Sequence, residues 1–137
     1  MRVMVVEDSI MLRERAVDVL NGIVGKQSVS EAGSVKEAIE KLAEFQPEIV
    51  ILDLLLPDGH GLDILTSIQS TRKATYVLVM TAEPSEQYRR RAFQLGATHF
   101  FDKMKDFEQV FLTVADITNH FSKEIQGLEA RGKCYGN

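Results

Sequence analysis

Five short runs of apolar and β-branched residues recur along the chain, and their spacing limits its possible folds more than any other feature. The runs cover residues 2–6, 27–32, 48–52, 75–80 and 97–101. Segments with apolar residues at helical spacing separate them. Two runs contain the uninterrupted apolar stretches VMVV and IVIL, which is typical of strands buried on both faces. The alternation predicts a parallel sheet with helices on both sides.

Five strand–helix units are too few for an eight-stranded barrel. We therefore expect an α/β fold of the flavodoxin-like (βα)5 class, a doubly wound sandwich whose five parallel strands follow the order 2-1-3-4-5. A capping box at Ser34 to Glu37 should start the second helix, and Asp106 should be the N-cap of the fifth. The buried stripe of the first helix should centre on Leu12, Ala16 and Val19.

The length of 137 residues corresponds to one domain. A net charge of −4 makes direct DNA binding and association with an anionic membrane poor expectations. A lone cysteine, Cys134, fits a reducing, cytoplasmic location. No apolar run approaches the length of a membrane span, and residues 1–9 do not resemble a signal peptide. We expect one domain over residues 1–121 and a short tail over residues 122–137 without a separate output domain. Its last part, Gly127 to Asn137, should be loosely ordered.

Polar residues follow the predicted strands where each strand ends. Glu7 and Asp8 follow the first, Asp53 the third, Thr81 the fourth and Lys103 the fifth. Ligands of open parallel sheets bind at this edge, where the strand order reverses. Three carboxylates crowded together repel one another unless a cation intervenes, and an all-oxygen set favours a hard divalent ion over zinc or copper.

Asp53 is the most informative of these acids because it interrupts the apolar octet 49–56, where an ionised group is costly unless it is compensated. An isolated Asp after a strand is otherwise most often a helix cap. A lysine and a hydroxyl aimed at the same crevice fit an anion carried on one carboxylate, and a phosphoryl group is the obvious candidate. Phosphoryl transfer needs mainly positioning and charge stabilisation, which Thr81, Lys103 and a cation would supply.

These residues lie within four motifs: VVEDS at 5–9, ILDLLLPDGHG at 51–61, VMTAE at 79–83 and LGATHFFDK at 95–103. In this order and spacing, over about residues 1–120, the chain resembles the receiver domain of a two-component response regulator, of the stand-alone kind similar to chemotaxis regulators. The resemblance implies a switch that uses one Mg²⁺ ion and accepts a phosphoryl group from a histidine kinase or histidine phosphotransfer protein. It implies no enzyme beyond slow magnesium-dependent self-phosphorylation and autodephosphorylation.

The resemblance also assigns roles to individual positions. The implied metal ligands are Glu7 (through water), Asp8, Asp53 and the backbone carbonyl of Leu55. The implied phosphoacceptor is Asp53, the phosphate-pairing residue is Lys103, and the switch residues are Thr81 and Phe100. The family usually has proline after this lysine, often in a cis peptide, whereas Met104 follows Lys103 here. A cis bond before a non-proline residue is costly, so we predict a trans Lys103–Met104 bond.

Candidate partner surfaces lie on two faces. Ile10 and Met11 point away from the predicted stripe of the first helix, beside the acids, and should dock the phosphoryl donor. Because the tail is short, the output should leave through the face formed by the fourth helix, the fifth strand and the fifth helix. Its candidate residues are Tyr88, Arg89, Arg91 and His99. His60, between two glycines, is interpreted as a solvated turn residue.

Three other functions remain open. An aspartate-nucleophile phosphatase would need an acid two residues after Asp53, where this chain has Leu55. A flavin carrier would need a glycine- and hydroxyl-rich loop after the first strand, and the segment EDSIMLRE has no glycine. A degenerate receiver that only scaffolds, independently of phosphorylation, is disfavoured by the intact set of acids, threonine and lysine. The sequence does not name the kinase or the downstream target.

Overall fold

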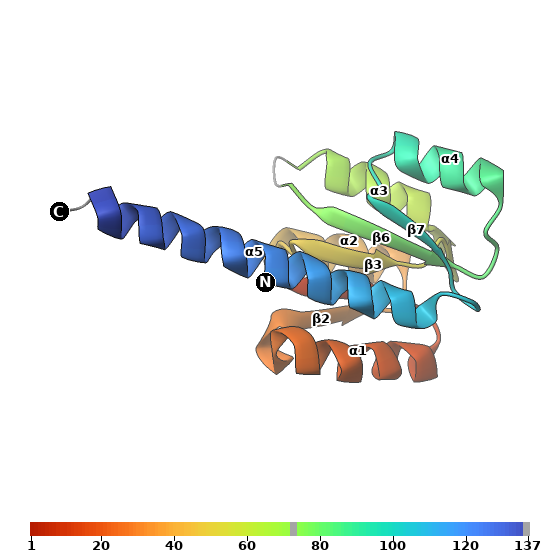
Figure 1. Ribbon diagram of the computed structural model, residues 1–137. Coiled ribbons are helices and arrows are strands. Elements are labelled where there is room, and N and C mark those ends of the chain that lie inside the picture. Colours follow the sequence, from red (N-terminus) through yellow and green to blue (C-terminus); the bar gives the residue numbers. More distant parts are fainter. Residues whose placement is uncertain (72–73, 136–137) are drawn as a thin grey trace.

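The computed structural model describes residues 1–71 and 74–135, and their central feature is one parallel sheet (Figure 1). Its five strands lie in the order β2-β1-β3-β6-β7. The bounds are β1 (Val3–Val6), β2 (Val29–Ala32), β3 (Ile49–Leu52), β6 (Tyr76–Thr81) and β7 (His99–Asp102). In chain order this is the predicted arrangement 2-1-3-4-5, with β1 beside β3 where the strand order reverses.

Helices cover both faces of the sheet (Figure 1). They are α1 (Ile10–Val24), α2 (Val35–Phe45), α3 (Gly61–Gln69), α4 (Glu86–Gln94) and α5 (Phe107–Tyr135), with a short 3₁₀ turn, η1 (Lys26–Ser28). Alternate side chains of β1 divide the core: Met4 and Val6 face α2, α3 and α4, while Val3 and Val5 face α1 and α5. This two-sided burial explains the uninterrupted apolar runs.

Helix ends follow local signals in most places. The Ser34 hydroxyl accepts from the Glu37 amide at 3.1 Å, but the Glu37 carboxylate binds Lys41 at 3.0 Å, so only this half of the predicted capping box is seen. Gly96 lies just past the end of α4 with φ of +102°, a backbone conformation that glycine adopts easily after a helix. Asp106 precedes α5 as predicted, and its carboxylate accepts from the Asp102 amide, linking the helix start back to β7.

Two sequence predictions are wrong in detail. The buried face of α1 centres on Ala16 and Leu20, and Val19 is 39% exposed. Positions four apart share a helix face, whereas Val19 is turned about 100° from Leu20. The predicted loosely ordered tail is also wrong over residues 127–135, because α5 continues to Tyr135 and projects past the sheet (blue in Figure 1). Residues 136–137 lie outside the described part of the chain. No proline interrupts residues 107–135, and Lys, Glu, Gln, Leu and Ala favour helix there.

A small hairpin between Asp53 and α3 was not predicted. Its strands are β4 (Leu55–Leu56) and β5 (Gly59–His60), and they pair Leu55 with His60. The strands are too short to show an alternating pattern in the sequence. Among the described parts of the chain, no helix is both long and apolar enough to cross a membrane.

Candidate functional site

Three of the residues singled out at strand ends, Glu7, Asp53 and Lys103, are held by backbone hydrogen bonds to neighbouring strands. The Glu7 amide donates to the Ala32 carbonyl at 2.9 Å, and the Asp53 amide donates to the Val6 carbonyl at 3.0 Å. The Lys103 amide donates to the Thr81 carbonyl at 2.8 Å. Because these residues lie one position past their strands and still bond to neighbouring strands, their side chains start from fixed points at one edge of the sheet.

Three carboxylates gather at this edge, as the sequence predicted. One oxygen each from Glu7, Asp8 and Asp53 lies within 4.8 Å of the others. Glu7 is 1% exposed and Asp53 is 4% exposed, while Asp8 is open to solvent. All three donors are hard carboxylate oxygens, two of them buried (Glu7 and Asp53) and one exposed (Asp8), and such a set is compatible with Mg²⁺.

Lys103 joins the two buried acids. Its Nζ lies 3.0 Å from Asp53 Oδ2 and also contacts Glu7 Oε1. The lysine side chain is itself only 10% exposed. Two carboxylates at this depth need nearby positive charge or a proton, and Lys103 supplies one charge for both.

The pKa values in this network follow from its burial. Burial raises the pKa of Glu7, and the nearby Asp53 charge adds to this, against the opposing effects of Lys103 and the Ser9 amide. Burial lowers the pKa of Lys103, but its bonds to Glu7 and Asp53 outweigh that effect and raise it overall. At neutral pH the lysine is therefore a firmly charged counter-ion, and Glu7 takes up a proton more readily than an ordinary glutamate does.

The second oxygen of Asp53 connects to the β4–β5 hairpin. Asp53 Oδ1 accepts from the Leu55 amide at 3.1 Å, so both carboxylate oxygens are engaged. At the hairpin tip, Asp58 turns away from the acids and caps α2, accepting from the Val35 and Lys36 amides at 2.8 and 3.0 Å. These amide bonds, that of Lys36 first, lower the pKa of Asp58. The sequence showed Asp58 but gave no sign of this partner helix.

The two expected switch residues lie beside this network. Thr81 ends β6 and is fully buried, and its hydroxyl accepts from the Glu83 amide at 3.2 Å. Phe100, on β7, is partly buried against the core beneath α4, where Tyr88 also packs. The bond that occupies the Thr81 hydroxyl here turns it toward the chain after β6.

Exposed apolar residues occur near the acids. Ile10 and Met11, expected on the outer side of α1, are 64% and 80% exposed. Met104 follows Lys103 through a trans peptide, as predicted, and is also exposed. An exposed apolar side chain next to Lys103 is a feature of the predicted site that the sequence already contains, apart from the peptide geometry.

The four output candidates differ in their surroundings. Arg89 lies over the Phe93 ring at 5.4 Å, and Arg91 donates to Gln94 at 3.4 Å, so both arginines are engaged along α4. The remaining two lie in ring contacts, His99 with Phe101 at 5.9 Å and Tyr88 with His60 at 5.2 Å.

The interpretation of His60 as a solvated turn residue is wrong. Its Nδ1 accepts from the Leu62 amide at 3.2 Å and caps α3, and its ring contacts Tyr88 of α4. The flanking glycines suggested an open loop, but Gly61 permits close backbone packing. A Cβ at residue 61 would lie 2.9 Å from the Leu54 Cα.

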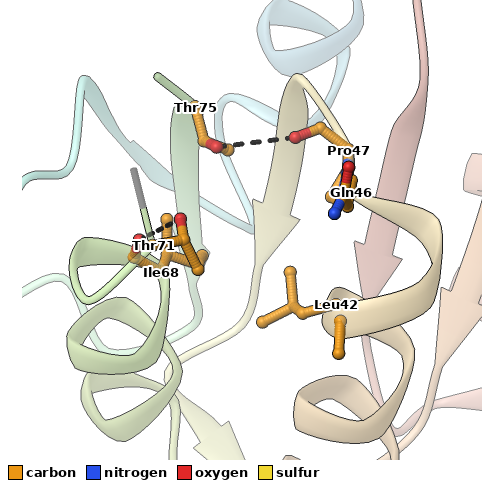
Figure 2. A pocket seen from close by; sticks show the side chains of 7 residues that line it. Leu42, Gln46, Pro47, Ile68, Thr71 and Thr75 are labelled. Atoms are coloured by element: carbon orange, nitrogen blue, oxygen red, sulfur yellow. Dashed lines mark hydrogen bonds between the residues drawn. The ribbon is translucent and has the colours of Figure 1, made fainter. Parts of the chain in front are cut away.

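A pocket of 270 Å³ lies at the other end of the strands, between the last turns of α2 and α3 (Figure 2). It is lined by Leu42, Ala43, Gln46, Pro47, Ile68, Thr71 and Thr75. Its threonine hydroxyls donate to the carbonyls of Ile68 and Pro47. The lining is largely apolar and contains none of the three acids, so this pocket is separate from the acidic cluster.

Comparisons with known proteins agree with this geometry. A sensory transduction protein, LytT, from Enterococcus faecalis is 32% identical over 91% of this chain and 49% of its own length. A protein-glutamate methylesterase/protein-glutamine glutaminase from Syntrophomonas wolfei is 29% identical over 91% of this chain and 35% of its own length. The chain thus spans half or less of these relatives.

Among solved structures, the chemotaxis protein CheY4 of Vibrio cholerae superposes with a TM-score of 0.73 at 26% identity. The match covers 82% of this chain and 94% of that one. The profile of the response regulator receiver domain matches residues 3–115, which include every residue of the acidic cluster together with Thr81 and Lys103. The chain therefore belongs to the receiver domain family of two-component response regulators.

Proposed function

We propose that Asp53 is the phosphoacceptor of a signalling switch and that residues 1–121 form the receiver unit. The observation that carries the proposal is the Asp53 carboxylate itself, 4% exposed, bonded to Lys103 and grouped with Glu7 and Asp8. A structural helix cap has no need of a buried lysine and two further acids. Membership of the receiver family supports a phosphorylation-dependent role.

The donor in this proposal is a phosphohistidine of a histidine kinase or phosphotransfer protein. An Asp53 oxygen attacks phosphorus, the P–N bond breaks, and the imidazole leaves as the P–O bond of an acyl phosphate forms. Lys103 is placed to pair with the phosphoryl oxygens, and the Thr81 hydroxyl, which accepts from the Glu83 amide, still has its own proton to donate to one of them. A magnesium ion held by Glu7, Asp8, Asp53 and the Leu55 carbonyl would neutralise charge on the transferred group.

Phosphorylation then changes the affinity for a partner protein. We assign donor docking to Ile10 and Met11, and readout to Tyr88, Arg89, Arg91 and His99. Direct DNA binding by this domain is not part of the proposal, given its net charge of −4. The lone Cys134 supports a cytoplasmic setting.

A small phosphodonor tests the assignment. Acetyl phosphate with Mg²⁺ should add one phosphoryl group to the wild-type chain, measured by intact mass, and Asp53→Asn should abolish the addition. Asp58→Asn is the matched control, because Asp58 lies in the same loop but caps α2. Labelling of Asp53→Asn at the wild-type rate would refute the assignment.

The same experiment separates the alternatives. A scaffold that does not depend on phosphorylation would gain no phosphoryl group under any condition. A phosphatase would release inorganic phosphate over many turnovers without retaining the label. Leu55, 37% exposed and unable to transfer a proton, stands where that class of enzyme needs its second acid.

A further inference from the structure

His60 connects the hairpin after Asp53 to α4. Its Nδ1 is committed to the Leu62 amide, so the ring proton of the neutral form lies on Nε2. Nε2 is buried and has no hydrogen-bond partner among the described residues. The ring contacts that of Tyr88, with centroids 5.2 Å apart and planes tilted by 47°. Among the described residues this half-buried imidazole is held by a cap and an aromatic neighbour, so it is sensitive to movement of either one.

A continuous set of contacts leads from the candidate phosphoacceptor to this ring. Asp53 Oδ1 accepts from the Leu55 amide at 3.1 Å. Leu55 pairs with His60 across the β4–β5 hairpin, and His60 contacts Tyr88. Three successive contacts therefore join the Asp53 carboxylate to α4.

The helix at the end of this path is lightly anchored. In α4 only Ala92 is fully buried, and Tyr88 is partly buried against the core cluster that includes Phe100. An element with so little buried apolar surface shifts at low cost. The single contact between the His60 and Tyr88 rings can therefore have a large effect on the position of α4.

We propose that His60 is a positioning residue that transmits the state of Asp53 to α4 through Tyr88. The inference rests on the proposed function, since it needs a modified Asp53. Phosphorylation turns one carboxylate oxygen of Asp53 into the bridging oxygen of an acyl phosphate, which changes the acceptor offered to the Leu55 amide and moves the hairpin that carries His60. A ring pair of this kind biases a two-state equilibrium by about two- to tenfold.

The test compares variants of the full chain by amide chemical shifts, with beryllofluoride and Mg²⁺ as the phosphoryl mimic. In the wild type, shifts should change over residues 53–61 and over residues 86–94. His60→Asn keeps a side-chain acceptor at the N-cap of α3 but removes the ring. It should keep the response of residues 53–61 and lose at least half of that of residues 86–94.

Tyr88→Leu keeps an apolar side chain on α4 and should reproduce the same loss, and combining it with His60→Asn should add little. His120→Asn is the matched control, because it removes an exposed imidazole that pairs with Glu124 along α5 and takes no part in these contacts. It should leave the α4 response intact. Unfolding of α3 in His60→Asn would show directly in the shifts of residues 61–69, and Tyr88→Leu then carries the test.

The outcomes separate the inference from the function on which it rests. If His60→Asn with α3 intact, or Tyr88→Leu, responds in α4 as the wild type does, His60 does not transmit the signal. If the wild type shows no change at residues 53–61, the proposed function fails first. A response of residues 86–94 that survives every variant except Asp53→Asn would assign transmission to another route.

Discussion

Removing the lysine that bridges the buried acids should destabilise the fold and alter its response to magnesium. In Lys103→Met the aliphatic stem remains, but Glu7 and Asp53 lose their shared cation while they stay 1% and 4% exposed. Removing one partner of a buried ion pair costs about 3–5 kcal/mol. We expect a value near the lower end, about 3 kcal/mol, because Glu7 has a raised pKa and can take up a proton.

The loss should depend on pH in a defined direction. Glu7 has a raised pKa in the folded state, so its contribution is present below the ordinary pKa of glutamate and is lost as pH rises through the folded value. Without Lys103 the pKa of Glu7 rises further, so the pH range over which protonated Glu7 stabilises the fold extends to higher pH. The gap between Lys103→Met and the wild type should therefore be larger at pH 7 than near pH ~4.5, where Glu7 is mostly protonated.

Urea unfolding followed by circular dichroism measures these quantities. A loss of about 3 kcal/mol lowers the midpoint by about 1–2 M at an ordinary urea slope. Mg²⁺ should stabilise Lys103→Met more than the wild type, because the ion no longer competes with the ammonium for Glu7 and Asp53. When the free Mg²⁺ concentration is about a hundred times its dissociation constant, binding raises the free energy of unfolding by about 2.7 kcal/mol.

The matched control is Lys105→Met, which removes an exposed lysine two residues away and should stay within about 0.5 kcal/mol of the wild type. The reasoning fails if Lys103→Met is as stable as Lys105→Met in metal-free buffer at pH 7. It fails equally if Mg²⁺ stabilises both variants by the same amount.

Three further changes test other parts of the site. Asp58→Asn weakens the cap on α2, and because the pKa of Asp58 is lowered in the folded state, the stability that its carboxylate contributes is lost as pH falls through that folded pKa. The urea midpoint of the variant should therefore vary less with pH than that of the wild type below pH ~4, and parallel plots of midpoint against pH would contradict this. Gly61→Ala puts a Cβ 2.9 Å from the Leu54 Cα and should lower the free energy of unfolding by about 2 kcal/mol in urea titrations, whereas unchanged stability would mean that the backbone yields. Ile10→Ser should slow phosphorylation by a protein donor but not by acetyl phosphate, followed by intact mass; equal slowing of both would place Ile10 in the site or the fold rather than in docking.

The sheet was predictable because its apolar runs repeat along the chain. The acid cluster was predictable because a charged residue within an apolar strand is energetically costly unless it has a function or a partner. Each strand buried on both faces must be apolar, so VMVV and IVIL identify the centre of the sheet. The strand order then places residues that follow β1 and β3 side by side without any long-range information. Asp53 stood out because a charge within an apolar octet needs compensation, and the structure shows that compensation in Lys103.

The missed features depend on contacts between segments distant in sequence. Nothing near Asp58 indicates that its carboxylate caps α2, more than 20 residues earlier in the chain. The contact of His60 with Tyr88 depends on where α4 packs, which the sequence pattern leaves open. Val19 was misplaced because Ala16 is compatible with stripes through residue 19 or residue 20, and only packing against the sheet decides between them.

The charges gathered at the strand ends favour a divalent cation in addition to the lysine. Three carboxylates against one ammonium leave a formal charge of −2 when all are ionised. Burial is the main cause of the raised pKa of Glu7, and the nearby Asp53 charge adds to it. Converting Asp53 to an acyl phosphate adds further negative charge. Lys103 cannot pair with the phosphoryl group and still hold Glu7 fully, so moving toward one weakens its bond to the other. A divalent ion held by the three acids would balance the excess and leave Lys103 free to pair with a phosphoryl group on Asp53, so metal binding and phosphorylation would favour each other.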